Sequence, residues 1–316
     1  MSSPLGIHDS VAAVFPAERL RDVLLDLEGD PGAESDLDVR VVSTAAIDDC
    51  TALVTFSYDD AFLEADLEWV HSIQAGVDRF PLDEFRDRGI VLTNSTGIHG
   101  DLVGETVAGY MLSFARRLHR YRSSQERREW HRPPWDEPFS LRGTSVCVVG
   151  LGTLGQGVAS RADALGMRVS GVKRTPTPVD GVDEVHPSSA LQEAIADARF
   201  VVLAVPLTDE TEKLIGEAEL SAMREDAVLI NVARGPVVDE AALVDALDRG
   251  DIGGAALDVF ETEPLPESSP LWGMDDVVVT PHVAAMSEDY YRRIAALVRE
   301  NVRRRASGEA YANRVV

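Results

Sequence analysis

Lysine is almost absent from this 316-residue chain, which has Lys173 and Lys213 and otherwise carries its positive charge on arginine. The 54 acidic residues outnumber the 30 basic ones, and the net charge is −24. Such a surface repels nucleic acid and anionic membranes, because the phosphate attraction that drives non-specific binding is reversed. Salt would screen this self-repulsion, so the composition favours a salt-adapted, halophilic protein. Arginine bias from a GC-rich genome is the alternative, but it explains the missing lysine and not the acidic excess.

Cysteine and long apolar runs are equally scarce. Cys50 and Cys147 give neither a disulfide framework nor the spacing of a metal site, as expected of a reduced intracellular protein. No segment approaches the roughly 18 uninterrupted apolar residues of a membrane span, and residues 1–15 lack the basic flank and apolar stretch of a signal peptide. We therefore expect a cytoplasmic protein with no membrane partner, no nucleic-acid partner and no metal.

Short β-rich runs alternate with helical stretches, which is the pattern of parallel sheets built from βαβ units. The expected strands lie at 11–15, 39–43, 52–57, 69–73, 90–94, 145–150, 168–172, 200–205, 227–232, 255–260 and 277–281. The clearest expected helices lie at 18–27, 82–89, 102–124 and 288–307, the last with Ser287 as its N-cap. About twelve strands exceed one open sheet, so the predicted fold class is α/β with two doubly wound parallel-sheet domains.

Turn residues at 93–97 mark the join between the two domains, and the last helix is free to return to the first domain. We therefore expect a discontinuous domain of residues 1–95 and 287–316, and a second domain of residues 96–286.

A glycine-rich turn follows the first strand of the second domain. The strand runs into Gly150, Gly152 and Gly155, and a helix-compatible stretch follows to Gly166. Glycines at this spacing allow a tight turn, close approach of the backbone to a pyrophosphate and tight helix–strand packing. Because strand, turn, helix and a further strand are all in order, the motif predicts dinucleotide binding and not merely a structural turn.

The next strand ends in Lys173 and Arg174, where NAD-binding proteins of this fold place an acidic residue on the ribose 2′-hydroxyl. Two cations attract a 2′-phosphate, and no carboxylate stands there to repel it. The pair predicts NADPH or NADP as the preferred cofactor, with NAD or NADH as the weaker alternative. A solvated basic turn is the competing interpretation.

Three later motifs follow apolar strands, where an open α/β sheet presents ligand groups at its carboxyl edge. They contain Arg234, the acidic pair Asp258 and Glu263, and His282. Arg234 offers a planar fork for a carboxylate and a carbonyl, and His282 would exchange a proton with the reacting oxygen. Glu263 would orient the imidazole. Singly, each has an ordinary surface or turn interpretation; together, after a dinucleotide motif, they favour catalysis.

Several motifs resemble the D-isomer-specific 2-hydroxyacid dehydrogenase family over nearly the whole chain. They are GLGTLGQG, AVPLTDETEKLIG, NVARGPVVDEAAL, LDVFETEPLP and TPHVA, together with HSIQAGVD and NSTGIHGDLVGET towards the first domain. The resemblance implies a Rossmann cofactor domain, a flavodoxin-like substrate domain, an active-site cleft between them and a homodimer. The basic stretch within 101–135 then belongs to the dimer interface, with Trp130 and Trp135 as apolar anchors.

The resemblance also assigns residues. It makes Arg234, Glu263 and His282 the catalytic set, and it gives the substrate carboxylate to the backbone N–H groups of Ala75, Gly76 and Val77, with Asn94 nearby at the hinge. Asp258 resembles the aspartate that contacts the nicotinamide amide. Further candidates for the cofactor site are Thr153, Leu154, Thr175, Val205, Pro206, Thr208, Val232, Ala233, His282 and Ala284. The expected pocket wall includes Tyr58, His71, Ser72 and Trp272.

The predicted reaction is the reversible reduction of a 2-keto acid to a D-2-hydroxy acid, with hydride from NADPH and a proton from His282. The motif WVHSIQAGVD resembles members acting on glyoxylate, hydroxypyruvate or larger aliphatic 2-keto acids. Two alternatives remain open. One is phosphite or formate oxidation within the same broad family, although Glu263 argues against formate. The other is a nucleotide-sensing regulator without turnover.

Overall fold

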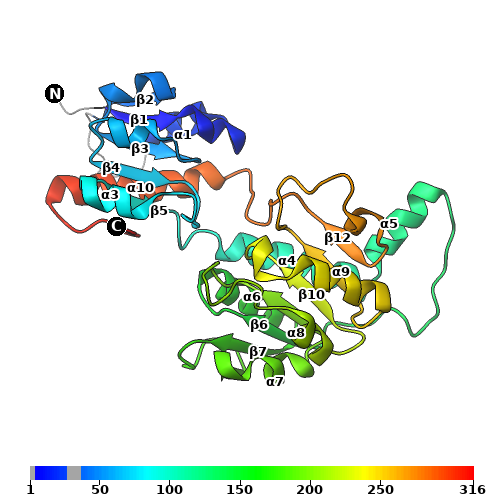
Figure 1. Ribbon diagram of the computed structural model, residues 1–316. Coiled ribbons are helices and arrows are strands. Elements are labelled where there is room, and N and C mark those ends of the chain that lie inside the picture. Colours follow the sequence, from blue (N-terminus) through cyan, green and yellow to red (C-terminus); the bar gives the residue numbers. More distant parts are fainter. Residues whose placement is uncertain (1–3, 27–36) are drawn as a thin grey trace. The chain divides into compact units, whose positions relative to one another are not determined.

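The computed structural model describes residues 4–26 and 37–316, and the chain divides into two compact units (Figure 1). Unit 1 comprises residues 1–98 and 287–316, and unit 2 comprises residues 99–286. Each unit is a parallel β-sheet covered by helices, which confirms the predicted α/β fold class.

Unit 1 contains a five-stranded sheet in the order β2-β1-β3-β4-β5, with every pair parallel. The strands are β1 Leu5–His8, β2 Val39–Val42, β3 Ala52–Thr55, β4 Trp69–Ser72 and β5 Val91–Asn94. The helices are η1 Asp9–Ala13, α1 Ala17–Leu25, η2 Thr44–Asp49, α2 Ala61–Glu64, α3 Leu82–Arg88 and α10 Tyr290–Ser307. This strand order is that of flavodoxin-like sheets.

Successive strand residues point to opposite sides of the sheet, and helices bury both sides of the unit 1 sheet. Ile7, Val54 and Trp69 pack with α1 and with Ile294 of α10, so the last helix completes the core of the first unit. The opposite face packs against α2 and α3.

Unit 2 contains a seven-stranded sheet in the order β12-β11-β10-β9-β6-β7-β8, again with every pair parallel. The strands are β6 Ser145–Val149, β7 Arg168–Lys173, β8 Glu184–Pro187, β9 Phe200–Leu203, β10 Val228–Asn231, β11 Gly254–Leu257 and β12 Val277–Val279. The strand order reverses between β6 and β9, which places a ligand crevice at the carboxyl ends of these two strands.

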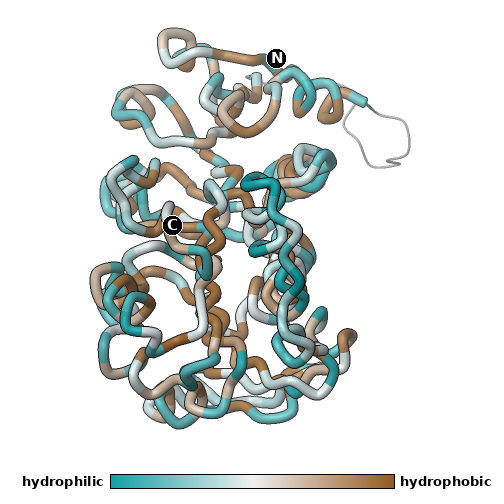
Figure 2. Tube along the Cα trace, turned by 90° about the vertical axis from the view of Figure 1, so that its right-hand side faces the viewer, coloured by the Kyte–Doolittle hydropathy of each residue, from teal (hydrophilic) through white to brown (hydrophobic). Residues whose placement is uncertain are grey.

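Helices cover both faces of the unit 2 sheet. They are α4 Gly100–Ala115, α5 Leu118–Arg127, α6 Thr153–Ala164, α7 Leu191–Ala196, α8 Glu217–Ala222 and α9 Glu240–Arg249, with short turns η3 Ser188–Ala190, η4 Gly235–Val237 and η5 Pro270–Gly273. One face packs against α4 and α6, and the other against α7, α8 and α9. In Figure 2 hydrophobic stretches of the chain lie mainly inside the trace, and hydrophilic stretches lie mainly on its periphery.

One strand prediction was wrong, and two strands, β1 and β8, were missed. Residues 11–15 do not form a strand, because residues 9–13 form η1 and the first strand is the more buried segment Leu5–His8. A short apolar run does not by its periodicity distinguish a strand from a helical turn. Strand β8 was missed, since it is an edge strand with no buried residue and no apolar run.

Two helix predictions also need correction. The helix expected over 102–124 is interrupted, because Arg117 adopts a left-handed φ of 58° and separates α4 from α5. Ser287 is not the N-cap of the last helix, which begins at Tyr290 after Asp289. The Ser287 hydroxyl oxygen instead accepts the N–H of Asp289 at 3.2 Å.

Cys50 and Cys147 are both buried free thiols. Within residues 4–26 and 37–316, no helix is long and apolar enough to cross a membrane. The same residues contain no group of three or more metal-ligating side chains in position to hold a metal ion.

Candidate active site

The glycine turn lies at the switch point of the unit 2 sheet. Gly150 has a φ of 96°, and a Cβ atom there would lie 2.6 Å from the carbonyl oxygen of Ala204. At Gly155 a Cβ would lie 1.8 Å from the carbonyl oxygen of Gly150, whereas at Gly152, the N-cap of α6, it would meet nothing within 4 Å. The turn is therefore closed on its protein side and open in front of the helix N-terminus, a geometry that fits a dinucleotide pyrophosphate.

Lys173 and Arg174 lie beside this turn. Strands β6 and β7 pair with Val149 opposite Val172, and Gly150 donates its N–H to the carbonyl oxygen of Val172 at 2.9 Å. Lys173 Nζ donates to Thr177 Oγ1 at 3.0 Å. In the part of the chain that the structure describes, no carboxylate forms an ion pair with either cation.

The other predicted cofactor positions follow neighbouring strands at the same edge of the sheet. Residues 205–208 follow β9, and the turn is closed by Thr211, which accepts the N–H of Thr208 and donates to the carbonyl oxygen of Pro206. The Val205 side chain lies against Gly150. Val232 and Ala233 are buried after β10. Thr153 and Leu154 open α6, and Thr175 is exposed after the two cations.

His282 and Glu263 form a pair at this edge. His282 Nδ1 lies 2.9 Å from Glu263 Oε2, and the other carboxylate oxygen accepts the N–H of Phe260 at 3.2 Å. Because a carboxylate only accepts hydrogen bonds, Nδ1 carries a proton and Nε2 is the nitrogen that remains for proton exchange. About a third of each side chain is exposed, 34% for His282 and 31% for Glu263, so the pair is open to a ligand.

Arg234 lies on the loop after β10. The Asn231 side chain holds this loop by donating to the carbonyl oxygen of Arg234 at 3.0 Å and accepting the N–H of Ala233 at 3.0 Å. Gly235 packs directly on the backbone of Phe260, where a Cβ would lie 1.9 Å from the carbonyl carbon. The loops that carry Arg234 and Glu263 therefore form one packed unit. Sequence reasoning missed Asn231, although a polar residue ending a wholly apolar strand is a usable signal.

Asp258 is buried and holds the loop that carries His282. Its Oδ1 accepts the Thr280 hydroxyl at 2.6 Å and the Val283 N–H at 2.9 Å, and its Oδ2 accepts the Ala284 N–H at 2.9 Å. The His282 N–H donates to the Asp258 carbonyl oxygen at 2.8 Å. The carboxylate thus fixes both sides of His282, a local role that comes in addition to any contact with a cofactor.

Tyr110 extends the same network. Its hydroxyl lies 2.6 Å from Thr280 Oγ1. Because the Thr280 hydroxyl has one hydrogen and donates it to Asp258, Tyr110 is the donor to Thr280. Burial raises the pKa of Tyr110 to about 12, consistent with a hydroxyl that stays protonated.

In unit 1, the turn after β4 carries the predicted carboxylate-binding groups. Among the described residues, the N–H groups of Ala75, Gly76 and Val77 have no acceptor within the protein. Asn94 Nδ2 donates to the carbonyl oxygen of Ala75 at 2.6 Å. Three free donors on one fixed turn fit the oxygens of a carboxylate.

The expected pocket wall is partly wrong. His71 and Ser72 are wholly buried at 0% exposure, and His71 bonds to the hydroxyls of Thr93 and Ser95 at 2.8 and 3.1 Å. Burial lowers the pKa of His71 to about 3, so this histidine is a neutral core residue. Trp272 is exposed and lines a hollow of unit 2 beside Leu118 and Arg122 of α5. Its place in the pocket wall, like that of Tyr58, stays a prediction.

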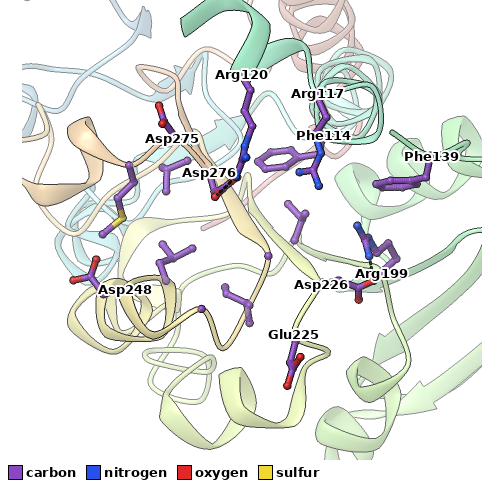
Figure 3. Close-up of a pocket in the computed structure, with 17 residues that line it drawn as sticks. Phe114, Arg117, Arg120, Phe139, Arg199, Glu225, Asp226, Asp248, Asp275 and Asp276 are labelled. Carbon is purple, nitrogen blue, oxygen red and sulfur yellow. Dashed lines mark hydrogen bonds and ion pairs between the residues drawn. The ribbon is translucent and has the colours of Figure 1, made fainter. Parts of the chain in front are cut away.

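Unit 2 also contains a cavity of about 510 Å³, which lies away from the predicted catalytic and cofactor residues (Figure 3). It is lined by residues that precede strands β9 to β12, hence at the amino edge of the sheet, together with Arg117 and Arg120. Arg120 Nη2 donates to Asp276 Oδ2 at 2.6 Å. Burial alone would raise the pKa of Asp276, but the hydrogen bonds from Arg120 outweigh it and lower the pKa to about 2. None of the predicted catalytic or cofactor residues lines this cavity.

The fold and the site together define a two-domain oxidoreductase that uses a nicotinamide cofactor. Residues 108–284 match the family model for the NAD-binding domain of D-isomer specific 2-hydroxyacid dehydrogenases. The chain belongs to this family, as its motifs indicated.

Several relatives of this chain are named glyoxylate reductases. Those of Korarchaeum cryptofilum and Thermococcus kodakarensis are each 35% identical to this chain, over 81% and 85% of its length and 80% and 84% of theirs. Among solved structures, a D-isomer specific 2-hydroxyacid dehydrogenase from Xanthobacter autotrophicus in complex with NADPH and MES has a TM-score of 0.83 and 34% identity, covering 100% of this chain and 98% of that one. An NADPH-dependent glyoxylate/hydroxypyruvate reductase from Sinorhizobium meliloti in complex with NADP and sulfate has a TM-score of 0.81 and 28% identity, covering 99% and 98%.

Proposed function

We propose that this protein reduces a 2-keto acid to a D-2-hydroxy acid with NADPH as the preferred cofactor. The observation that carries the proposal is the His282–Glu263 pair, fixed by Asp258 at the carboxyl edge of a Rossmann sheet. A bound nicotinamide supplies the hydride. The chain's own residues bind the substrate, orient it and supply the proton.

The role proposed for each residue combines its contacts with the family resemblance. His282 donates a proton from Nε2 to the carbonyl oxygen, and Glu263, bonded at Nδ1, orients the ring so that Nε2 faces the substrate. Arg234 directs its guanidinium fork at the substrate's carboxylate and carbonyl oxygens. The N–H groups of Ala75, Gly76 and Val77 bind the substrate carboxylate. These interactions fix which face of the carbonyl receives the hydride.

The variant His282→Ala tests the catalytic assignment. Loss of a general acid lowers turnover by about 10²- to 10⁴-fold, while NADPH binding is retained because the glycine turn is untouched. Steady-state kinetics with glyoxylate and hydroxypyruvate measure the first effect, and fluorescence titration of NADPH the second. His186→Ala, at the edge strand β8, is the matched control. Unchanged turnover in His282→Ala would overturn the assignment.

The NADPH preference is proposed on Lys173 and Arg174, two cations beside the glycine turn. Replacing both by alanine removes charge-assisted bonds to the 2′-phosphate and is expected to raise the KM for NADPH by about ten- to a hundredfold, with little effect on NADH. Lys213→Ala is the control, because this other lysine pairs with Asp239 away from the turn. Equal losses with NADPH and NADH would mean that the cations form only a charged turn.

The substrate class is proposed from the relatives, which are named glyoxylate reductases. We expect activity with glyoxylate, hydroxypyruvate or a larger aliphatic 2-keto acid, and none with phosphite. A panel of these compounds, run with both cofactors at low and high salt, tests substrate and salt adaptation together. NADPH binding without turnover of any compound would instead favour a nucleotide-sensing regulator.

We also propose a homodimer formed through residues 101–135. In Figure 1, α5 and the loop that follows it project from the rest of unit 2. Trp130 and Trp135 lie in this loop and are 101% and 92% exposed, which is unusual for tryptophan and typical of interface anchors. Light scattering of the double variant Trp130→Ser/Trp135→Ser should show a shift from dimer to monomer. A wild-type monomer would refute the proposal.

A further inference from the structure

Residues 312–315, which follow α10, lie antiparallel along the edge strand β5. The N–H of Asn94 donates to the carbonyl oxygen of Asn313 at 3.2 Å, and the N–H of Val315 donates to that of Leu92 at 2.7 Å. Thr93 and Arg314 form the bridge between these bonds. A segment 219 residues later in the sequence therefore lies against the end of the strand that carries Asn94.

The Asn313 side chain connects this C-terminal segment to the residues at the end of β5. Its Nδ2 donates to the carbonyl oxygen of Thr96 at 2.6 Å and to that of Asn94 at 3.2 Å. The residue has a left-handed φ of 53°, a conformation that asparagine accepts more readily than most side chains.

Asn301 of α10 fixes the segment immediately before it. The Ala312 N–H donates to Asn301 Oδ1 at 2.7 Å, and Asn301 Nδ2 donates back to the Ala312 carbonyl oxygen at 3.2 Å. Asn301 is 1% exposed, so this support is shielded from water. The helix thereby fixes the backbone that places Asn313.

Asn94 in turn is hydrogen-bonded to the turn after β4. Its Nδ2 donates to the Ala75 carbonyl oxygen at 2.6 Å, and its Oδ1 accepts the Thr96 N–H at 3.2 Å. In a trans peptide the carbonyl of one residue and the N–H of the next point in opposite directions. Fixing the Ala75 carbonyl therefore fixes the direction of the Gly76 N–H, one of the three donors for which the described residues supply no acceptor.

We propose that Asn313 is a positioning residue for the carboxylate-binding turn, acting through Asn94. The inference rests on the proposed function, because the ligand of the turn is the 2-keto acid carboxylate. Asn313 itself touches no substrate. It holds the ends of β5 and of the turn in the orientation that binds an anion.

The variant Asn313→Gly tests this role. Glycine keeps the left-handed backbone and removes only the side-chain donors, so the fold is retained. The KM for glyoxylate should rise by about three- to tenfold, the effect of one or two lost hydrogen bonds, with kcat and the KM for NADPH unchanged. Asn313→Asp should raise the same KM further, since a carboxylate would face two carbonyl oxygens. Arg314→Ala, one residue along and exposed, is the control.

Hydrogen exchange of residues 73–80 and 94–96 supplies a readout that does not depend on turnover. The N–H groups of Ser95 and Thr96 are bonded to the Gln74 carbonyl oxygen and to Asn94 Oδ1. Their exchange should become faster in Asn313→Gly and not in Arg314→Ala, while β1 and α1 exchange as in the wild type. If the wild type turned over no 2-keto acid, the proposed function would fail, yet faster exchange would still support the positioning role. An unchanged KM for glyoxylate in both Asn313 variants, or unchanged exchange at Ser95 and Thr96 in Asn313→Gly, would overturn the inference.

Discussion

Replacing Asp258 by asparagine should detach His282 from its working position while leaving the fold of unit 2 largely intact. The wild-type carboxylate accepts three hydrogen bonds, two at Oδ1 and one at Oδ2. An asparagine oxygen placed at the Oδ1 position keeps the bonds from Thr280 and Val283. Its amide nitrogen then faces the Ala284 N–H, so one charge-assisted bond becomes a contact between two donors.

The size of the effect follows from this geometry. Losing a hydrogen bond to a charged acceptor and leaving a buried N–H unsatisfied costs about 2–4 kcal/mol, which we expect as a loss in the free energy of unfolding unless the loop moves to relieve it. Moving the loop shifts His282, whose own N–H is bonded to the Asp258 backbone. A displacement near 1 Å lowers turnover by about a hundredfold.

The assay compares urea unfolding and kcat for wild type, Asp258→Asn and Asp245→Asn. Asp245 is exposed on α9, so its variant removes the same charge without removing the three bonds. Tyr110→Phe is a graded companion that removes one donor to Thr280 and should cost about 1 kcal/mol. Stability and kcat in Asp258→Asn equal to those of the Asp245 control would refute the reasoning.

Three further predictions concern other parts of the chain. His71 is neutral in the fold with a pKa of about 3, so below the ordinary histidine pKa only the unfolded chain takes up its proton. Between pH 7 and pH 5 this proton uptake should lower the free energy of unfolding by about 2 kcal/mol. In denaturant titrations the stability advantage of wild type over His71→Asn should therefore shrink by this amount. Parallel pH profiles of the two proteins would contradict the prediction. Gly155→Ala should destabilise the fold by about 3 kcal/mol or more, because its Cβ would lie 1.8 Å from the Gly150 carbonyl oxygen, whereas Gly152→Ala should fold normally and bind NADPH weakly. Burial raises the pKa of Cys147 to about 11 and also that of Cys50, so thiol reagents should modify neither before unfolding.

Much of the fold was readable from the sequence because its signals are local. Each central strand of the parallel sheets is a short continuous apolar run, since it is buried on both faces. The glycine turn and the two cations after it lie within one βαβ unit, so spacing alone indicated where they would meet. Two features were missed. Edge strand β8 has no apolar run by which to recognise it, and the left-handed residue Arg117 leaves no pattern in the sequence.

The sequence by itself determined the family, the two α/β domains and the residue types at the ends of the strands, all of which depend on neighbours close along the chain. The tertiary structure decided which of those residues support one another. It placed Asp258 against the N–H groups of Val283 and Ala284, buried His71 as a neutral core residue, and brought Asn313 to Asn94. These contacts join segments separated by up to 219 residues, which only the fold of each unit brings together. No local pattern encodes such a pairing, because either partner taken alone carries no sign of the other.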